Sequence, residues 1–181
     1  MKTLTDNLKV SGALAAKKAV AKTALIAVGV AFELAAKYSQ DVRDEVATWK
    51  DNLVFAMGVL PNGPYITIQK TGHDQIKYLG SYMQKPDVAI LFKNFDCALM
   101  VFTGQMGTHI AAAERRFIIR GNIGETMSIN RALGIVQSFL FPGIIVQKTF
   151  RRVPESNAER TLAKVKVMAA LTPALALKAF K

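Results

Sequence analysis

The sequence predicts an α+β fold in which a mostly antiparallel sheet is covered by helices. Two observations favour this class. Segments in which apolar and polar residues alternate strictly, as in half-buried strands, occupy the middle of the chain between residues 65 and 120. Segments with apolar residues at the three- and four-residue spacing of a helix lie before, between and after them.

The composition predicts one core and more apolar side chain than that core requires. A chain of 181 residues fits one domain with extensions. Its hydrophobic share is 51% and its mean hydropathy is +0.21, whereas roughly 45–50% apolar residues is ordinary for a soluble domain. The surplus could line a ligand cavity, an oligomer interface or a membrane-facing helix, and composition does not choose between them.

The first third of the chain is predicted to be helical. Residues 14–37 are rich in alanine and lack proline, which favours a helix. Ser39 is expected to cap a second helix from Gln40 to Met57, which the turn at residues 61–64 would follow. One face of this second helix would carry an apolar stripe made of Val42, Val46, Trp49 and Leu53.

Four strands are expected to follow as an antiparallel meander. They cover residues 65–70, 75–79, 88–92 and 115–121, and residues 144–150 are a candidate fifth strand. Residues 71–74 have the composition of a hairpin connection between the first two. The alternation places Phe117 and Ile119 inward on the fourth strand, whose outer face is basic.

Two helices are predicted within this part of the chain. Asn94 is placed to cap residues 95–102, which are apolar on every side except at Asp96. Such a helix must be covered on more than one side, either as a central core helix or between the sheet and an apolar ligand. The second helix, which continues to Phe141, would bury a stripe made of Ile129, Leu133, Val136 and Leu140.

The tail is expected to form two helices. Residues 156–159 resemble a capping box, so a helix over 157–171 is predicted. Thr172 and Pro173 would then begin a short helix that ends near Phe180.

Positive charge is concentrated at the two ends of the chain. Of the net +11, residues 1–38 hold six lysines against two acidic residues, and residues 151–181 hold seven basic residues against two acidic ones. Such ends would be attracted to an anionic surface, either lipid headgroups or nucleic acid. In the tail the cations adjoin leucine, valine and methionine, as in helices that lie at a membrane interface. The alternative is a solvated helix packed on its own domain. The predicted membrane-surface residues are Arg160, Lys164, Lys166, Lys178 and Lys181.

The sequence shows no sign of catalytic chemistry. His73 and His109 lie in predicted loops, and the single cysteine, Cys97, is interpreted as a core residue. No nucleophile elbow, phosphate-binding loop or dinucleotide fingerprint is present. We therefore expect no enzymatic activity, no catalytic residue, no metal site and no cofactor. The N-terminal apolar run at 24–32 is too short to span a bilayer, and no signal peptide is recognised, so we expect a cytoplasmic protein.

A resemblance to a known family covers residues 64–150 and is most specific between Asp87 and Leu133. The matching residues are Thr103-Gly104-Gln105-Met106, Ala111, the run from Arg115 to Asn122, and Met127. This pattern resembles the sterol carrier protein type 2 family. The chain departs from the family at residues 107–109, where Asn-Pro-Gln is common, at Arg115, where glycine is common, and at Ala112, where phenylalanine is usual.

The resemblance implies a twisted sheet of about five strands whose covering helices enclose an apolar tunnel. It also implies binding of a lipid, whether fatty acyl, phospholipid, sterol-like or isoprenoid. The division expected is a basic helical extension at 1–38, a lipid-binding domain at 39–153 and a basic amphipathic tail at 154–181. The residues predicted to line the tunnel are Ile66, Ile68, Val88, Ile90, Phe102, Met106, Phe117, Ile119, Leu133, Val136 and Leu140.

The sequence therefore predicts a non-enzymatic lipid carrier that associates peripherally with an anionic membrane, at its inner face. A basic nucleic-acid-binding protein is the alternative from another class, since the isoelectric point is about 9.9. The tail, however, lacks the interleaved aromatic residues of a single-strand platform, and we expect no specific nucleic acid partner. An accessory subunit of a lipid-modifying enzyme complex is a further alternative. Whether the chain forms a homodimer stays open.

Overall fold

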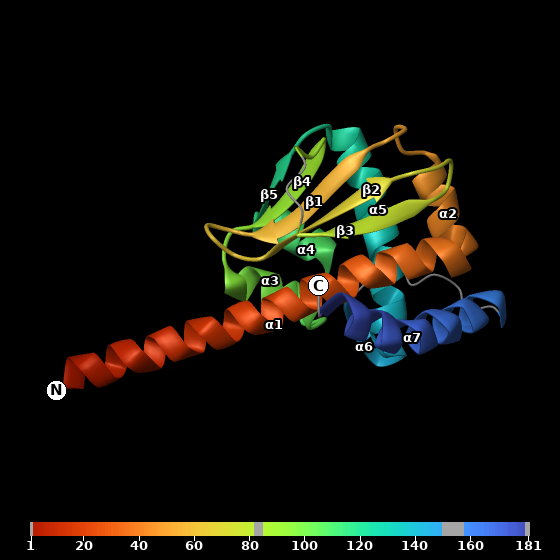
Figure 1. Ribbon diagram of the computed structural model, residues 1–181. Coiled ribbons are helices and arrows are strands. Elements are labelled where there is room, and N and C mark those ends of the chain that lie inside the picture. The colour runs from red at the N-terminus through yellow and green to blue at the C-terminus, as the bar shows by residue number, and fades with distance from the viewer. Residues whose placement is uncertain (1, 82–84, 150–157, 180–181) are drawn as a thin grey trace.

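The computed structural model describes residues 2–81, 85–149 and 158–179. A five-stranded sheet forms one layer, and the helices gather on one of its faces (Figure 1). The predicted α+β class is confirmed. The face toward the helices is called the inner face below, and the opposite one the outer face.

The sheet is mixed but mostly antiparallel. Its strands are β1 (Val54–Val59), β2 (Tyr65–Lys70), β3 (Ile76–Gly80), β4 (Val88–Phe92) and β5 (Phe117–Arg120), in the order β3-β2-β1-β4-β5. The predicted meander is wrong in one respect. Strand β4 lies beside β1 instead of β3 and pairs with it in parallel, while the other three pairs are antiparallel.

Strand β1 occupies a segment that the sequence assigns to a helix. Helix α2 (Gln40–Ala47) ends ten residues before the predicted Met57. Asn52, with φ of 58°, lies in the turn that follows. Every residue of β1 is buried, and β1 is the central strand of the sheet. A strand buried on both faces has a continuous apolar sequence without alternation, which helical periodicity can imitate.

Helix α1 (Lys2–Tyr38) is the longest described element, and its second half packs under the sheet. It contacts β2, β3, α2, α3, α5 and α7. Gly29 lies against the sheet so closely that a Cβ there would stand 2.5 Å from the ring of Tyr78. The first turns project beyond the body of the protein (Figure 1), and residues 12–20 are exposed.

Part of α1 has the length and the apolar composition of a membrane-spanning helix. Residues Gly12–Tyr38 form a helix long enough to cross a bilayer, and its most apolar stretch of 18 residues has a mean hydropathy of 1.8, although half of that stretch is buried within the protein. The apolar run at 24–32 was expected to be too short to span a bilayer, whereas the whole helix is long enough. A buried core helix and an N-terminal signal sequence share this length and composition, and Leu25, Val28 and Phe32 belong to the main core.

The middle helices are α3 (Phe95–Phe102), the short α4 (Thr108–Ala113) and α5 (Ile123–Leu140). Two of these three were predicted, whereas α4, which contains His109, lies where a loop was expected. The side chain of Asn94 accepts a hydrogen bond from the backbone N–H of Cys97, so it caps α3 as expected. Asn122 caps α5 in the same way, through the N–H of Glu125.

The last two helices correct two predictions. The predicted strand at 144–150 is wrong for residues 144–149, because Gly143–Thr149 form helix α6, in which Ile144 is 83% exposed; residue 150 lies outside the described residues. The tail forms one helix, α7 (Ala158–Ala179), with Pro173 inside it. A proline removes one backbone hydrogen bond from a helix, but α7 continues across that point and packs along α1. The predicted capping box at 156–159 begins outside the described residues.

A single hydrophobic core joins the sheet to helices from both ends of the chain. The rings of Phe32, Trp49 and Phe55 contact one another with centroids 5.6 to 6.0 Å apart, which links α1, the α2–β1 connection and β1. Val167 and Leu171 of α7 belong to the same core. The division of the chain at residues 38 and 154 stays a prediction.

Candidate ligand-binding site

The candidate site lies between the inner face of the sheet and helices α1, α3 and α5. Residues directly opposite each other on paired strands point to the same face. The register pairs Phe55 with Ile68 and with Val88, and Met57 with Ile66 and with Ile90. The ring contact between Phe55 and Phe32 of α1 shows that this set faces the helices.

The structure brings most of the predicted lining residues into one apolar layer. Six of them are almost fully enclosed: Ile66, Ile68, Val88, Ile90, Leu133 and Val136. Phe102 of α3 is also buried, and its ring meets that of Phe92 with centroids 5.1 Å apart. The inward side of β2 and β4 was therefore predicted correctly, whereas the tunnel itself stays a prediction.

Burial decreases toward the edge strand β5. Phe117, Met106 and Leu140 are only partly buried, and Ile119 is 40% exposed although its pairing with Ile90 places it on the inner face. At the start of α5, Ile123 is 74% exposed. The apolar layer is thus enclosed beneath the central strands and open beside β5.

One polar group lies buried beside this apolar layer, and no pattern in the sequence indicates it. Gln137 of α5 is 2% exposed, and its Nε2 finds no hydrogen-bond acceptor among the described residues. It follows Leu133 by four residues and precedes Leu140 by three, so the three share one face of α5. Its amide therefore lies on the same side of α5 as residues predicted to line the tunnel.

A polar cluster fixes α5 against α2. The hydroxyl of Ser128 accepts a hydrogen bond from Trp49 Nε1 at 3.0 Å, lies 3.0 Å from the hydroxyl of Thr48, and donates to a carboxylate oxygen of Glu45 at 3.1 Å. Arg131 donates to the same carboxylate at 3.0 Å. These contacts set the position of α5 and hence of the apolar face that it turns to the sheet.

The tail supplies two cations to the interior contacts of the protein. Arg160 donates to Asp41 at 2.6 Å and to the hydroxyl of Ser138 at 2.9 Å, with its guanidinium over the ring of Phe139. Burial lowers the pKa of Arg160, and the charge of Asp41 partly offsets this. Lys164 donates to the backbone oxygens of Ser138 and Phe141, which satisfies the end of α5.

The five predicted membrane-surface cations therefore differ in their surroundings. Arg160 and Lys164 are engaged within the protein, whereas Lys166 is exposed. The side chains of Lys178 and Lys181 lie outside the described residues. Beside Lys166, α7 carries exposed apolar side chains at a spacing of three residues, namely Leu162, Val165 and Met168.

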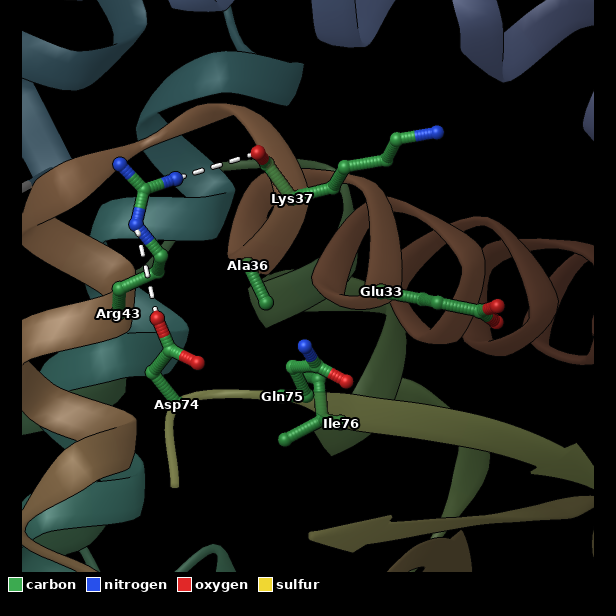
Figure 2. Close-up of a pocket in the computed structure, with 7 residues that line it drawn as sticks. All are labelled: Glu33, Ala36, Lys37, Arg43, Asp74, Gln75 and Ile76. Atoms are coloured by element: carbon green, nitrogen blue, oxygen red, sulfur yellow. Dashed lines mark hydrogen bonds and ion pairs between the residues drawn. The ribbon is translucent and has the colours of Figure 1, made fainter. Parts of the chain in front are cut away.

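A separate polar cavity of about 390 Å³ lies where α1, α2 and β3 meet (Figure 2). Arg43 reaches across it, donating to the backbone oxygen of Lys37 at 3.1 Å and lying 3.9 Å from Asp74. Glu33, which also lines it, accepts a hydrogen bond from the backbone N–H of Tyr78. Of its charged groups, Arg43 and Asp74 approach each other, and the cavity contains none of the predicted site residues.

The residues considered for catalysis are dispersed. Cys97 is buried in α3, whereas His73 and His109 are exposed, His73 in the connection from β2 to β3 and His109 in α4. Within the described ranges, no group of three or more histidine, cysteine, aspartate or glutamate residues lies close enough to hold a metal ion.

Comparison with known proteins finds likeness only among solved structures. No family model matches the chain, and no curated protein matches it. A conserved hypothetical protein of Thermus thermophilus, suggested to be a sterol carrier protein, is 15% identical with a TM-score of 0.47, over 72% of this chain and 91% of its own. Sterol carrier protein domain 2 of Helicoverpa armigera is 18% identical with a TM-score of 0.42, over 71% and 89%.

A third example is sterol carrier protein 2 like 2 from Aedes aegypti, which is 10% identical with a TM-score of 0.35, over 54% of this chain and 94% of its own. Two of these neighbours are named as sterol carrier proteins and the third is suggested to be one, the class that the sequence resembles. The identities are at most 18% and the TM-scores at most 0.47. The roles of residues in this chain are therefore argued from its own structure.

Proposed function

We propose that this chain is a non-enzymatic carrier that holds a lipid between the inner face of its sheet and helices α1, α3 and α5. The observation that carries the proposal is the buried amide of Gln137 beside an otherwise apolar layer. A buried donor without an acceptor costs about 1–3 kcal/mol. A lipid with a hydroxyl or carbonyl oxygen would satisfy the amide and place its hydrocarbon chain against the isoleucines of β2 and β4.

The partly exposed apolar edge at β5 supports the same proposal. A bound lipid needs a path between the enclosed layer and the outside, and burial decreases in this direction, from Ile90 through Phe117 to Ile119. We assign the opening of the site to the gap between β5 and the start of α5.

Replacing Gln137 with leucine tests where the polar end of the ligand lies. Leucine has a similar size and no unsatisfied amide, so Gln137→Leu should leave the free protein equally stable or stabilise it by about 1–3 kcal/mol. It should weaken binding of hexadecanol and leave binding of hexadecane unchanged, as measured by calorimetric titration. Leu162→Gln, which changes an exposed position on α7, is the control for both ligands. Equal effects of Gln137→Leu on the two ligands would contradict this placement.

We also propose that the outer side of α7 brings the carrier to an anionic membrane surface. The support is the exposed row of Leu162, Val165 and Met168 beside Lys166, in a chain with net charge +11. Apolar side chains that enter the headgroup region together with nearby lysines favour binding to anionic lipids. The inner side of α7 is not available for this, because Ala163, Val167 and Leu171 are buried.

Co-sedimentation with liposomes tests the membrane proposal. Replacing Leu162, Val165 and Met168 together by aspartate should reduce sedimentation with vesicles of phosphatidylserine and phosphatidylcholine, while the buried side of α7 still holds the helix in place. Binding by the parent protein should rise with the anionic fraction and fall with salt. A variant that sediments as well as the parent would show that α7 serves only its own domain.

A further inference from the structure

The outer face of the sheet is unusually apolar along its two central strands. A sheet face turned to water normally carries polar side chains at alternate positions. Here the outward positions of β1 are Val54, Ala56 and Gly58, and those of β4 include Ala89 and Leu91. Ala56 and Ala89 are at least nine-tenths buried, although the helices lie on the other face (Figure 1).

Small residues in the middle of this face create a hollow. The register places Thr67, Ala56, Ala89 and Arg120 side by side across β2, β1, β4 and β5. The next row along the strands begins with Tyr65 and Gly58 and continues with Leu91. Alanine and glycine therefore occupy the centre, with larger side chains around them. A cavity of about 470 Å³ results, within the range of sites that hold small molecules.

The chain that leads into β4 forms one wall of the cavity. Lys85, Pro86 and Asp87 line it opposite the small residues. The carboxylate of Asp87 accepts a hydrogen bond from the backbone N–H of Val54 at 2.9 Å, which holds this wall to the edge of β1. Gly121, with φ of 111°, packs against the backbone of Asp87 so closely that a Cβ would overlap it. The wall is therefore held at both β1 and the end of β5.

Two cations lie at the rim of this apolar hollow. Arg120 and Lys85 both line the cavity and are exposed. Within the part of the chain that the structure describes, neither forms an ion pair. The one acidic group of the lining, Asp87, already accepts from Val54. An apolar floor with a positive rim is complementary to a molecule that has a hydrocarbon part and one anionic group.

We propose that this outer-face cavity is a second binding site, which takes a small amphipathic carboxylate with its chain over Ala56 and Ala89 and its carboxylate at Arg120. The site is separate from the inner-face lipid site, because the sheet itself stands between them, and it does not depend on that assignment. Arg120 fits this role because its planar guanidinium can donate two parallel hydrogen bonds to one carboxylate.

The test uses decanoate as the probe and methyl resonances as the readout. In full-length protein labelled with 13C at alanine and isoleucine methyl groups, decanoate should shift Ala56 and Ala89, which face outward. Shifts at Ile66, Ile68 and Ile90, which face inward, would report decanoate in the inner-face lipid site and are independent of this result. Shifts confined to the isoleucines would overturn the outer site and still agree with the inner one, so the two assignments fail separately.

Two substitutions then test the chain and the carboxylate contacts. Ala89→Leu should fill the hollow and abolish the decanoate shift at Ala56. Arg120→Gln, at an exposed position where folding is not at risk, should weaken decanoate binding about two- to fivefold, the range for an exposed ion pair, and leave decanol binding unchanged. Lys93→Gln, an exposed lysine outside the cavity, is the matched control. Decanoate binding that is insensitive to Arg120→Gln, or equally sensitive to Lys93→Gln, would overturn the proposal.

Discussion

At the scale of single residues, the fold depends on polar groups that are buried together with their partners. Lys70 at the end of β2 is 2% exposed, and its ammonium donates to the backbone oxygen of Trp49 at 2.6 Å and approaches that of Ala47 at 3.4 Å. Asp51 lies 3.4 Å away. The ammonium thus satisfies carbonyl groups left free where α2 ends, and it ties that end to the sheet.

Replacing Lys70 with methionine should therefore destabilise the protein. The methionine would keep the apolar stem but leave the oxygen atoms of Trp49 and Ala47 without a donor, at a cost of about 1–3 kcal/mol. Urea unfolding of Lys70→Met measures this, with Lys77→Met at an exposed position of β3 as the control. If the two variants lose equal stability, the contacts of Lys70 do not stabilise the fold.

Tyr78 gives a prediction about alkaline pH. Burial raises the pKa of its phenol above the ordinary value near 10. Below pH 10 the phenol is neutral in both folded and unfolded chains, and its contribution to stability is fully present. As pH rises from 10 through the raised folded-state pKa, the unfolded chain loses this proton first, so stability falls. Urea unfolding between pH 8 and 11 should show a shallower decline for Tyr78→Phe than for the parent. Identical slopes would contradict this.

At the scale of elements, the sequence predicts the sheet's inner face better than it predicts where helices end. Ile66 and Ile68 were placed correctly because apolar and polar residues alternate there as in a half-buried strand. Val88 and Ile90 were placed correctly because residues 88–92 form a short apolar run, typical of a buried strand, in which alternate residues share a face. Strand β1 was missed, since Val42, Val46, Trp49 and Leu53 keep a helical spacing past the true end of α2. All four are buried, but the last two lie in the connection to β1. The unpaired amide of Gln137 was missed because its neighbours become known only from the packing.

The cluster around Ser128 is predicted to hold α5 against α2. Ser128→Ala would remove the hydrogen-bond partner of the buried Trp49 Nε1, so we expect a loss of about 1–3 kcal/mol. Arg131→Ala would remove only the exposed ion pair with Glu45 and should lower the free energy of unfolding by less than about 1 kcal/mol. Chemical unfolding of both variants decides the point. A larger loss for Arg131→Ala than for Ser128→Ala would show that the surface ion pair, and not the buried hydroxyl, joins the two helices.

At the scale of the whole molecule, one sheet separates two apolar regions of different character. The inner region is enclosed by helices from both ends of the chain and holds a buried amide. The outer one is a shallower hollow with cations at its rim. The cations of the tail are divided as well, since Arg160 and Lys164 fasten α7 to α5 while Lys166 faces outward. This arrangement would leave the outer side of α7 free for a surface while its inner side completes the core.

The central claim is that a lipid chain lies against the inner face of the sheet. Nuclear Overhauser effects between bound hexadecanol and 13C-labelled methyl groups test it most directly, since they require contact within a few ångströms. The account predicts such effects at the methyl groups of Ile66, Ile68 and Ile90, and none at that of Ala56 on the outer face. Bound hexadecanol whose effects reach only Ala56, or saturation with hexadecanol that gives no effect at these isoleucines, would contradict it.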